Sequence, residues 1–313
     1  MTAETLMPER KRCLLLYFIT GLVIGALLAV VVSFCSPYCR KLIQSNTRYR
    51  HSHLIAVTNN NKNIPTDLSQ TIRVLCWIVS NGKHQKSRAQ HVKRTWGRRC
   101  NKLIFVSWQN DQELGTKPED SGNSWSKTQA ALKYIYANHL DEADWFFRAD
   151  DQTYAIMENM RYFLYNYSPE TPIYFGHKVK DHISANAGYV LSKAALRRFV
   201  EKALPNDKLC IRNSTRTESI ELSECLENVG VILGDSRDRH GCARFVPFRL
   251  NKYLTSWRRD YTIFKSAEDL TCCSQTVIAY NFVMPYKMYL LDHFIYHMRT
   301  NNTAIAPISL PLR

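Results

Sequence analysis

The sequence predicts an α/β domain, a mainly parallel β-sheet flanked by helices, placed after an N-terminal transmembrane helix. Short apolar, β-branched runs alternate with segments that repeat apolar residues at helical spacing, which is typical of a sheet covered on both faces. One long uncharged run, residues 13–35, precedes them. With 45% hydrophobic and 22% charged residues in a chain of 313, a packed core is expected and wholesale disorder is not.

The predicted strands are nearly continuous apolar runs, as expected for strands buried on both faces. They are residues 72–79, 103–107, 144–149, 173–175, 189–191 and 230–233.

Helical spacing of apolar residues predicts helices between these strands, in segments 87–100, 124–140, 155–165 and 192–200. Ser124 and Ser192 are the predicted N-cap residues of two of them, because a serine hydroxyl can accept a hydrogen bond from the first helical turn.

Residues 13–35 contain no charge and would span about 34 Å as a helix, enough to cross a bilayer. Arg10, Lys11 and Arg12 stand directly before them, which favours a cytoplasmic N-terminus. The rival interpretation is a cleaved signal peptide, whose apolar region is usually shorter. We therefore expect a cytoplasmic tail (1–12), a signal anchor (13–35), a polar stem (36–70), a lumenal domain (71–300) and a tail (301–313).

Seven cysteines follow the predicted anchor and its flank, and an oxidising lumen would allow three bridges with one cysteine left over. No CxxC motif occurs, so a zinc site is disfavoured. Glycosylation sequons at Asn166, Asn213 and Asn301 also suit the secretory pathway.

The formal net charge is +15. A solvated basic surface explains such an excess as readily as an anionic ligand, for example a nucleotide diphosphate, or an anionic surface. Nucleic acid is disfavoured, because the sequence carries no helix-turn-helix, zinc-finger or RNA-binding signature.

Asp150 and Asp151 come directly after the predicted strand 144–149. Ligands of α/β sheets bind at the carboxyl ends of strands, and paired carboxylates there can hold a divalent cation that neutralises a departing diphosphate. An ordinary exposed turn is the alternative, since Asp favours turns.

A series of motifs resembles, in order, the core 1 β1,3-galactosyltransferase family from about residue 70 to 300. They are His91-Val-Lys-Arg-Thr-Trp96, Ala143-Asp-Trp-Phe-Phe-Arg-Ala-Asp-Asp151, Pro172-Ile-Tyr-Phe-Gly176, Ala187-Gly-Tyr-Val-Leu-Ser-Lys193, Gly234-Asp-Ser-Arg-Asp238, Cys272-Cys273-Ser274 and Tyr296-His-Met-Arg299.

The resemblance implies a GT-A (nucleotide-diphospho-sugar transferase) fold, UDP-galactose as donor and Mn²⁺ as cofactor. It implies an acceptor that is N-acetylgalactosamine O-linked to glycoproteins, and an inverting displacement in which an acidic residue takes the proton of the acceptor hydroxyl. It also implies a single-pass type II protein of the Golgi or endoplasmic reticulum membrane, with a homodimer or a heterodimer with a related transferase as the expected assembly.

The resemblance further implies roles for single residues of this chain. Arg94, Trp96, Asp150 and Asp151 lie on the nucleotide-sugar side, and Asp150, Asp151 and His297 are the expected metal ligands. Trp125, Gly188 and Tyr189 fall on the acceptor side. The implied disulfides are Cys76–Cys100, Cys210–Cys225 and a vicinal Cys272–Cys273, which leaves Cys242 either as a thiol or as a link between chains.

Two departures from the family pattern concern the chemistry. The third position of the acidic triplet is Gln152, and an amide oxygen is a weaker ligand for a hard cation than a carboxylate. The segment 219–225 is shorter than in the family and lacks the second acid of a pair, which is the family's expected base. Glu221, or else Glu224, is the candidate to take its place.

Three functions therefore compete: an active galactosyltransferase, a catalytically weak or inactive relative that acts as chaperone or partner of an active enzyme, and a lectin-like binder of the sugar nucleotide or O-glycan. The retained Asp150 and Asp151 favour the transferase.

Overall fold

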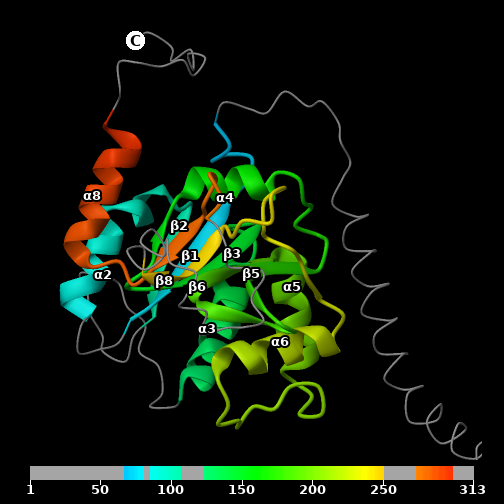
Figure 1. Ribbon diagram of the computed structural model, residues 1–313. Helices are drawn as coiled ribbons and strands as arrows, with labels where there is room; N and C mark the ends of the chain where they lie inside the picture. The colour runs from blue at the N-terminus through cyan, green and yellow to red at the C-terminus, as the bar shows by residue number, and fades with distance from the viewer. Residues whose placement is uncertain (1–66, 81–84, 107–122, 250–272, 299–313) are drawn as a thin grey trace, which may run out of the picture. The chain divides into compact units, whose positions relative to one another are not determined.

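A six-stranded mixed sheet is the centre of the computed structural model, which describes residues 67–80, 85–106, 123–249 and 273–298 (Figure 1). The strand order is β2-β1-β3-β6-β5-β7. Within it, β6 runs antiparallel to β3 and β5, and the other pairs are parallel. The strands are β1 (Val74–Val79), β2 (Lys102–Val106), β3 (Trp145–Asp150), β5 (Ile173–Val179), β6 (His182–Ser192) and β7 (Ile232–Leu233). The predicted mainly parallel sheet is confirmed.

Burial on both faces explains why β1 has a continuous apolar sequence. Side chains alternate between the two faces of a strand. Val74, Cys76 and Ile78 belong to one hydrophobic cluster, and Leu75 and Trp77 belong to the other.

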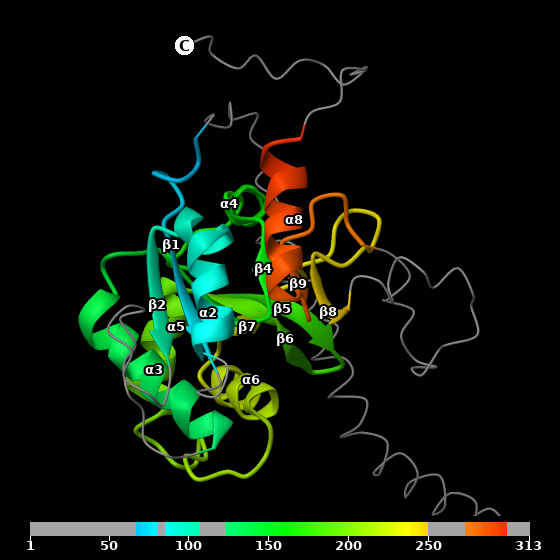
Figure 2. The same ribbon diagram turned by 90° about the vertical axis from the view of Figure 1, so that its left-hand side faces the viewer.

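Helices cover the two faces of the sheet in two groups. On one face lie α2 (Gln85–Arg94), α4 (Met157–Leu164) and α8 (Pro285–Tyr296). On the other lie α3 (Ser124–His139), α5 (Lys193–Arg198) and α6 (Glu218–Asn228). The short helical turns η2 (Trp96–Arg99) and η3 (Phe199–Ala203) extend α2 and α5. Figures 1 and 2 both show α2 and α8 side by side.

One of the two predicted helix N-caps is confirmed, and the other differs by one residue. Ser192 caps α5 as expected, accepting a hydrogen bond from the backbone N of Ala195 at 3.1 Å. At α3 the N-cap is Asn123, whose Oδ1 accepts from Ser126 N at 2.9 Å, and Ser124 is the first helical residue. Asparagine and serine are about equally good N-caps, so adjacent candidates are hard to separate by sequence.

A second, three-stranded sheet in the order β4-β9-β8 connects the loop after β3 to the C-terminal helix. Its strands are β4 (Tyr154–Ala155), β8 (Phe245–Arg249) and β9 (Ala279–Asn281). In addition, the backbone N of Val283 donates to the carbonyl of Gln152 at 2.9 Å. The N-terminal end of α8 therefore lies beside that loop.

Two disulfides implied by the resemblance are present, Cys76–Cys100 and Cys210–Cys225. The expectation that Cys242 is left over is wrong, because Cys242 is disulfide-bonded. Cys273 carries a thiol and not the vicinal bridge implied for it, and Cys272 lies outside the described residues.

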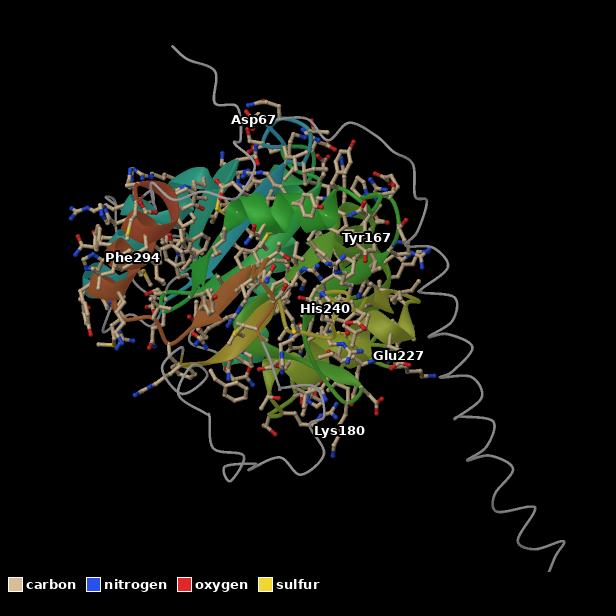
Figure 3. The ribbon with its side chains drawn as sticks, turned by 45° about the horizontal axis from the view of Figure 1, so that its top comes forward. Asp67, Tyr167, Lys180, Glu227, His240 and Phe294 are labelled. Carbon is tan, nitrogen blue, oxygen red and sulfur yellow. A yellow bond between two sulfur atoms is a disulfide. The ribbon has the colours of Figure 1, made fainter. Side chains whose placement is uncertain are left out.

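The outer face of α8 is apolar. Its large exposed side chains include Tyr286 (61% exposed), Phe294 (55%) and, just beyond the helix, Met298 (52%). Figure 3 shows Phe294 at the edge of the molecule, and Lys180 at the tip of the β5–β6 hairpin.

None of the helices in the described ranges is both long and apolar enough to cross a membrane. The predicted anchor at 13–35, the stem as far as residue 66 and Asn301 lie outside those ranges.

Candidate functional site

The acidic loop, residues 150–153, lies where β1 and β3 end. The two strands are parallel and Val79 is paired with Asp150, so their carboxyl ends meet at one edge of the sheet. This is the edge at which α/β sheets bind ligands. The sequence-based placement of Asp150 at a strand end is therefore confirmed.

Asp150 stabilises its own turn. Its Oδ1 accepts hydrogen bonds from the backbone N of Gln152 and from Thr153 Oγ1, both at 2.9 Å. Burial raises the pKa of Asp150, while the nearby Arg148 and the two hydrogen bonds oppose that rise. Among the described residues, no hydrogen bond reaches its Oδ2.

Asp151 points to β1 and α2 instead. It is 4% exposed, and its Oδ2 accepts a hydrogen bond from Ser80 Oγ at 2.7 Å. Its Oδ1 lies 3.9 Å from Arg88 Nη1, a distance that allows an ion pair but no hydrogen bond. The two neighbouring carboxylates therefore have different partners.

Two amide side chains also lie in or beside the loop. Gln152 follows the two acids, and Asn281 lies on β9 next to Tyr280, the strand partner of Tyr154. Asn281 is 2% exposed, and its Oδ1 accepts from the backbone N of Phe282 at 2.7 Å. The sequence analysis did not single out Asn281, although a buried polar residue at the end of an apolar run is a usable signal.

His297 is not brought to the loop. It is the C-cap residue of α8, which begins beside the loop and is 12 residues, or about 18 Å, long. Its Nε2 lies 3.9 Å from Asp292 Oδ2 instead. Among the described residues no group of three or more His, Cys, Asp or Glu side chains could hold a metal ion. The expected ligand set of Asp150, Asp151 and His297 is therefore not assembled.

A buried ionic cluster lies between β3, which ends in the loop, and α6. Arg148, two residues before Asp150, donates from Nη1 to the carbonyl of Ala185 at 2.9 Å and from Nη2 to Glu218 Oε2 at 3.1 Å. Tyr189 Oη donates to Glu218 Oε1 at 3.0 Å. All three ionisable side chains are buried, and a charge within an apolar strand was the signal that could have revealed the cluster.

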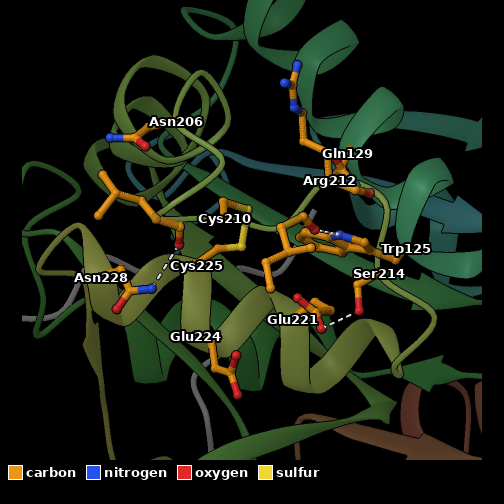
Figure 4. The surroundings of a disulfide bond; sticks show 12 residues. Trp125, Gln129, Asn206, Cys210, Arg212, Ser214, Glu221, Glu224, Cys225 and Asn228 are labelled. Atoms are coloured by element: carbon orange, nitrogen blue, oxygen red, sulfur yellow. Dashed lines mark hydrogen bonds between the residues drawn. A yellow bond between two sulfur atoms is a disulfide. The ribbon is translucent and has the colours of Figure 1, made fainter.

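Glu221, the expected base, lies elsewhere. It is 1% exposed, and its Oε1 accepts from Ser214 Oγ at 2.6 Å and also from Arg216 Nε. Arg216 binds Glu224 as well. Figure 4 shows Glu221 and Ser214 in the region around the Cys210–Cys225 bridge. Of the acids on α6, the structure brings Glu218 next to the loop strand in place of Glu221 or Glu224.

Trp96 holds the end of the loop by a hydrogen bond. Its side chain is fully buried, and its Nε1 donates to the carbonyl of Thr153 at 2.8 Å. A fully buried ring cannot stack on a nucleotide, so the expected nucleotide contact of Trp96 becomes an indirect one. Arg94, at the end of α2, is exposed.

The expected acceptor-side residues are part of the core. Trp125 is fully buried, packs edge-on against Phe199 and donates from Nε1 to the carbonyl of Ile211 at 2.8 Å. Tyr189 is fully buried as well. Gly188 has φ +82, and a Cβ there would lie 2.4 Å from the carbonyl oxygen of Arg148. These residues are buried and do not offer surface to a ligand.

In the part of the chain that the structure describes, this edge of the sheet has one oxygen of Asp150 that accepts no hydrogen bond, and a guanidinium, Arg88, that lies 3.9 Å from its carboxylate partner. Hydroxyl groups suit the carboxylate as hydrogen-bond donors, and an anionic group suits the guanidinium.

Similarity to known proteins bears on the family of this chain. The Fringe-like family matches residues 71–202. Glycoprotein-N-acetylgalactosamine 3-beta-galactosyltransferase 1 of Xenopus laevis is 38% identical over 269 residues, covering 80% of this chain and 72% of the relative. Chondroitin sulfate synthase 3 of Homo sapiens is 26% identical over 181 residues, covering 49% of this chain but 20% of that protein.

Among solved structures, 4-diphosphocytidyl-2C-methyl-D-erythritol synthase from Anaerococcus prevotii covers 53% of this chain and 87% of its own, with 11% identity and a TM-score of 0.35. The identity to the Xenopus protein extends over most of both chains and includes the sheet and the acidic loop. The chain therefore belongs to the core 1 β1,3-galactosyltransferase family.

Proposed function

We propose that this protein transfers galactose from UDP-galactose, in β1,3 linkage, to N-acetylgalactosamine that is O-linked to glycoproteins. The observation that carries this proposal is the 38% identity, over 80% of the chain, to a relative named for galactosyl transfer to glycoprotein N-acetylgalactosamine. The acidic loop at the carboxyl edge of the sheet, in a GT-A-like arrangement, supports it.

The proposed reaction is an inverting displacement. The acceptor hydroxyl attacks the anomeric carbon of galactose, its proton passes to a carboxylate, and the bond to UDP breaks, with the electron pair leaving on the diphosphate. Asp150 is the candidate proton acceptor, because its Oδ2 has no hydrogen-bond partner among the described residues. Glu218 is a positioning residue, since it holds Arg148 beneath the loop.

The donor site is proposed without the Mn²⁺ that the resemblance implies. The described residues do not fit that ion, because Asp150 and Asp151 have separate partners, the third position is an amide and His297 stands at the far end of α8. No step of the reaction is therefore assigned to a metal.

The proposed setting is the Golgi or endoplasmic reticulum membrane, with the chain as a single-pass type II protein and residues 71–300 as the lumenal domain. Asn166 and Asn213 are exposed, which suits their proposed glycosylation. The proposed assembly is a homodimer, or a heterodimer of this chain with a related transferase.

The test is galactose transfer by the full-length chain, expressed in cells that lack endogenous core 1 transferase. Membranes are incubated with radiolabelled UDP-galactose and an N-acetylgalactosamine-bearing peptide. Transfer is expected, with a loss of at least about 10²-fold in Asp150→Asn.

The matched control is Glu221→Gln, which changes an acid held away from the loop and is expected to keep most activity. Absence of transfer in the unaltered chain, together with recovery of a co-expressed active relative, would replace the enzyme with a chaperone.

A further inference from the structure

We propose that this chain binds the diphosphate of its nucleotide sugar without a divalent cation, with the Arg88 guanidinium supplying positive charge that a metal would otherwise supply. The inference rests on the proposed function for the class of ligand, a nucleoside diphosphate sugar. It concerns how the two negative charges of the diphosphate are neutralised.

The carboxylates of the loop do not converge on one point. A hard divalent cation takes about six oxygen ligands that face it together. Asp150 Oδ1 is directed into its own turn by Gln152 and Thr153, while Asp151 Oδ2 is held by Ser80 at the end of β1. The two carboxylates are therefore held by different parts of the chain, Asp150 by its own turn and Asp151 by the residue that follows β1.

Two amides and an imidazole are further polar side chains near the loop. Gln152 and Asn281 present neutral oxygens, and the Asn281 oxygen already accepts a hydrogen bond from Phe282. His91, the imidazole of α2, is hydrogen-bonded through Nδ1 to Tyr289 Oη at 2.9 Å. None of these three side chains adds a carboxylate, the ligand that a hard divalent cation prefers.

Arg88 has the properties that a diphosphate requires. It lies on α2, a helix without a single acidic residue, and its side chain is 27% exposed at the loop. Arg88 forms an ion pair of 3.9 Å with Asp151 and makes no hydrogen bond among the described residues. Its N–H groups are therefore available to bind a ligand. A guanidinium can bind two phosphate oxygens at once, and a partly buried setting strengthens that contact.

The test is calorimetric titration of the full-length chain in detergent with UDP, once in EDTA and once in excess manganese chloride. We expect dissociation constants within about twofold of each other, because no ion is needed. Manganese tightening the binding by about tenfold or more would overturn the inference, and so would the absence of UDP binding in EDTA.

A pair of variants tests whether Arg88 is the side chain that neutralises the diphosphate. Arg88→Gln is expected to weaken UDP binding in EDTA about tenfold or more, and Lys93→Gln, which removes the same charge from another side of α2, to leave it within about twofold. Equal binding by Arg88→Gln and the unaltered chain contradicts the assignment. Thermal unfolding of each variant checks that it is folded.

The outcome separates this inference from the proposed function. Manganese-dependent UDP binding with galactose transfer means that the function stands and the inference fails. UDP binding that ignores manganese, without transfer to the glycopeptide, means that the inference stands and the transferase proposal fails.

Discussion

Arg148 Nη2 and Glu218 Oε2 lie 3.1 Å apart in an ion pair whose side chains are 9% and 6% exposed. The pair joins the strand that ends in the acidic loop to the first turn of α6, 70 residues away in sequence. A buried charge is tolerated only with a partner, so the position of the loop strand and the position of the helix depend on each other.

Replacing one member of this pair should be costly. Glu218→Ala leaves the Arg148 charge buried and unpaired, and is expected to reduce the free energy of unfolding by about 3–5 kcal/mol. Urea unfolding of the purified chain measures the change. Glu224→Ala is the control, because its pair with Arg216 is half exposed and is expected to contribute less than about 1 kcal/mol. Similar losses in the two variants would contradict a special role for the buried pair.

Substitutions at two glycines with similar φ angles distinguish the stability cost of steric crowding from that of backbone strain. Gly188 has φ +82 and Gly241 has φ +79, but an added Cβ at Gly188 would lie 2.4 Å from the Arg148 carbonyl oxygen, whereas nothing lies within 4 Å at Gly241. We expect Gly241→Ala to cost about 1–2 kcal/mol of stability from backbone strain.

Gly188→Ala should cost more than about 3 kcal/mol or prevent folding, because backbone atoms must shift. Expression level and thermal unfolding report both. If Gly188→Ala were as stable as Gly241→Ala, the tight packing against β3 would be incorrect.

The Cys210–Cys225 bridge should stabilise the region that precedes α6. It closes a loop with a sequence separation of 15, for which chain entropy predicts about 3 kcal/mol. The double variant with Ala at both positions should lower the unfolding free energy by about that amount. Cys273→Ala lies in neither of the two described bridges and should change stability by less than about 1 kcal/mol, since that side chain is only partly buried. A larger loss in the single variant would be unexpected.

Buried tyrosines predict a loss of stability in alkali. Burial raises the pKa of Tyr174 to about 12 and that of Tyr280 to about 12, from the usual 10.0. In the unfolded chain they ionise near 10, so the folded state binds more protons between these values, and stability is full below pH 10 and falls as pH rises towards about 12.

The slope contributed by Tyr174 should approach about 1.4 kcal/mol per pH unit in this window. Urea unfolding at about pH 9 and about pH 11 measures it, with Tyr174→Phe expected to reduce the slope. An unchanged slope in that variant would mean that Tyr174 does not remain protonated in the folded protein.

The sheet could be predicted from sequence because each strand in its centre is a short apolar run. The prediction for 144–149 and the observed β3 differ by one residue at each end. The direction of β6 could not be predicted in this way, since strand direction depends on pairing with β3 and β5 and not on local composition. Helix α6 was missed because its acidic residues obscure the apolar stripe of Leu222 and Leu226.

The candidate site was predicted less well than the sheet. Asp150 and Asp151 could be placed at the end of a strand because they are adjacent to it in the sequence. Glu221 and His297 were selected by their place in a motif, which does not say where a side chain points. The Glu218 contacts depend on residues far apart in the chain, and no local pattern records such a contact.

The apolar outer face of α8 has a practical consequence. An exposed stripe that includes Tyr286 and Phe294 is solvated poorly, and in isolation it favours self-association that strengthens with temperature and with sulfate salts. Preparations of this protein should therefore stay monodisperse longer in mild detergent than in plain buffer. Light scattering measures this self-association through α8.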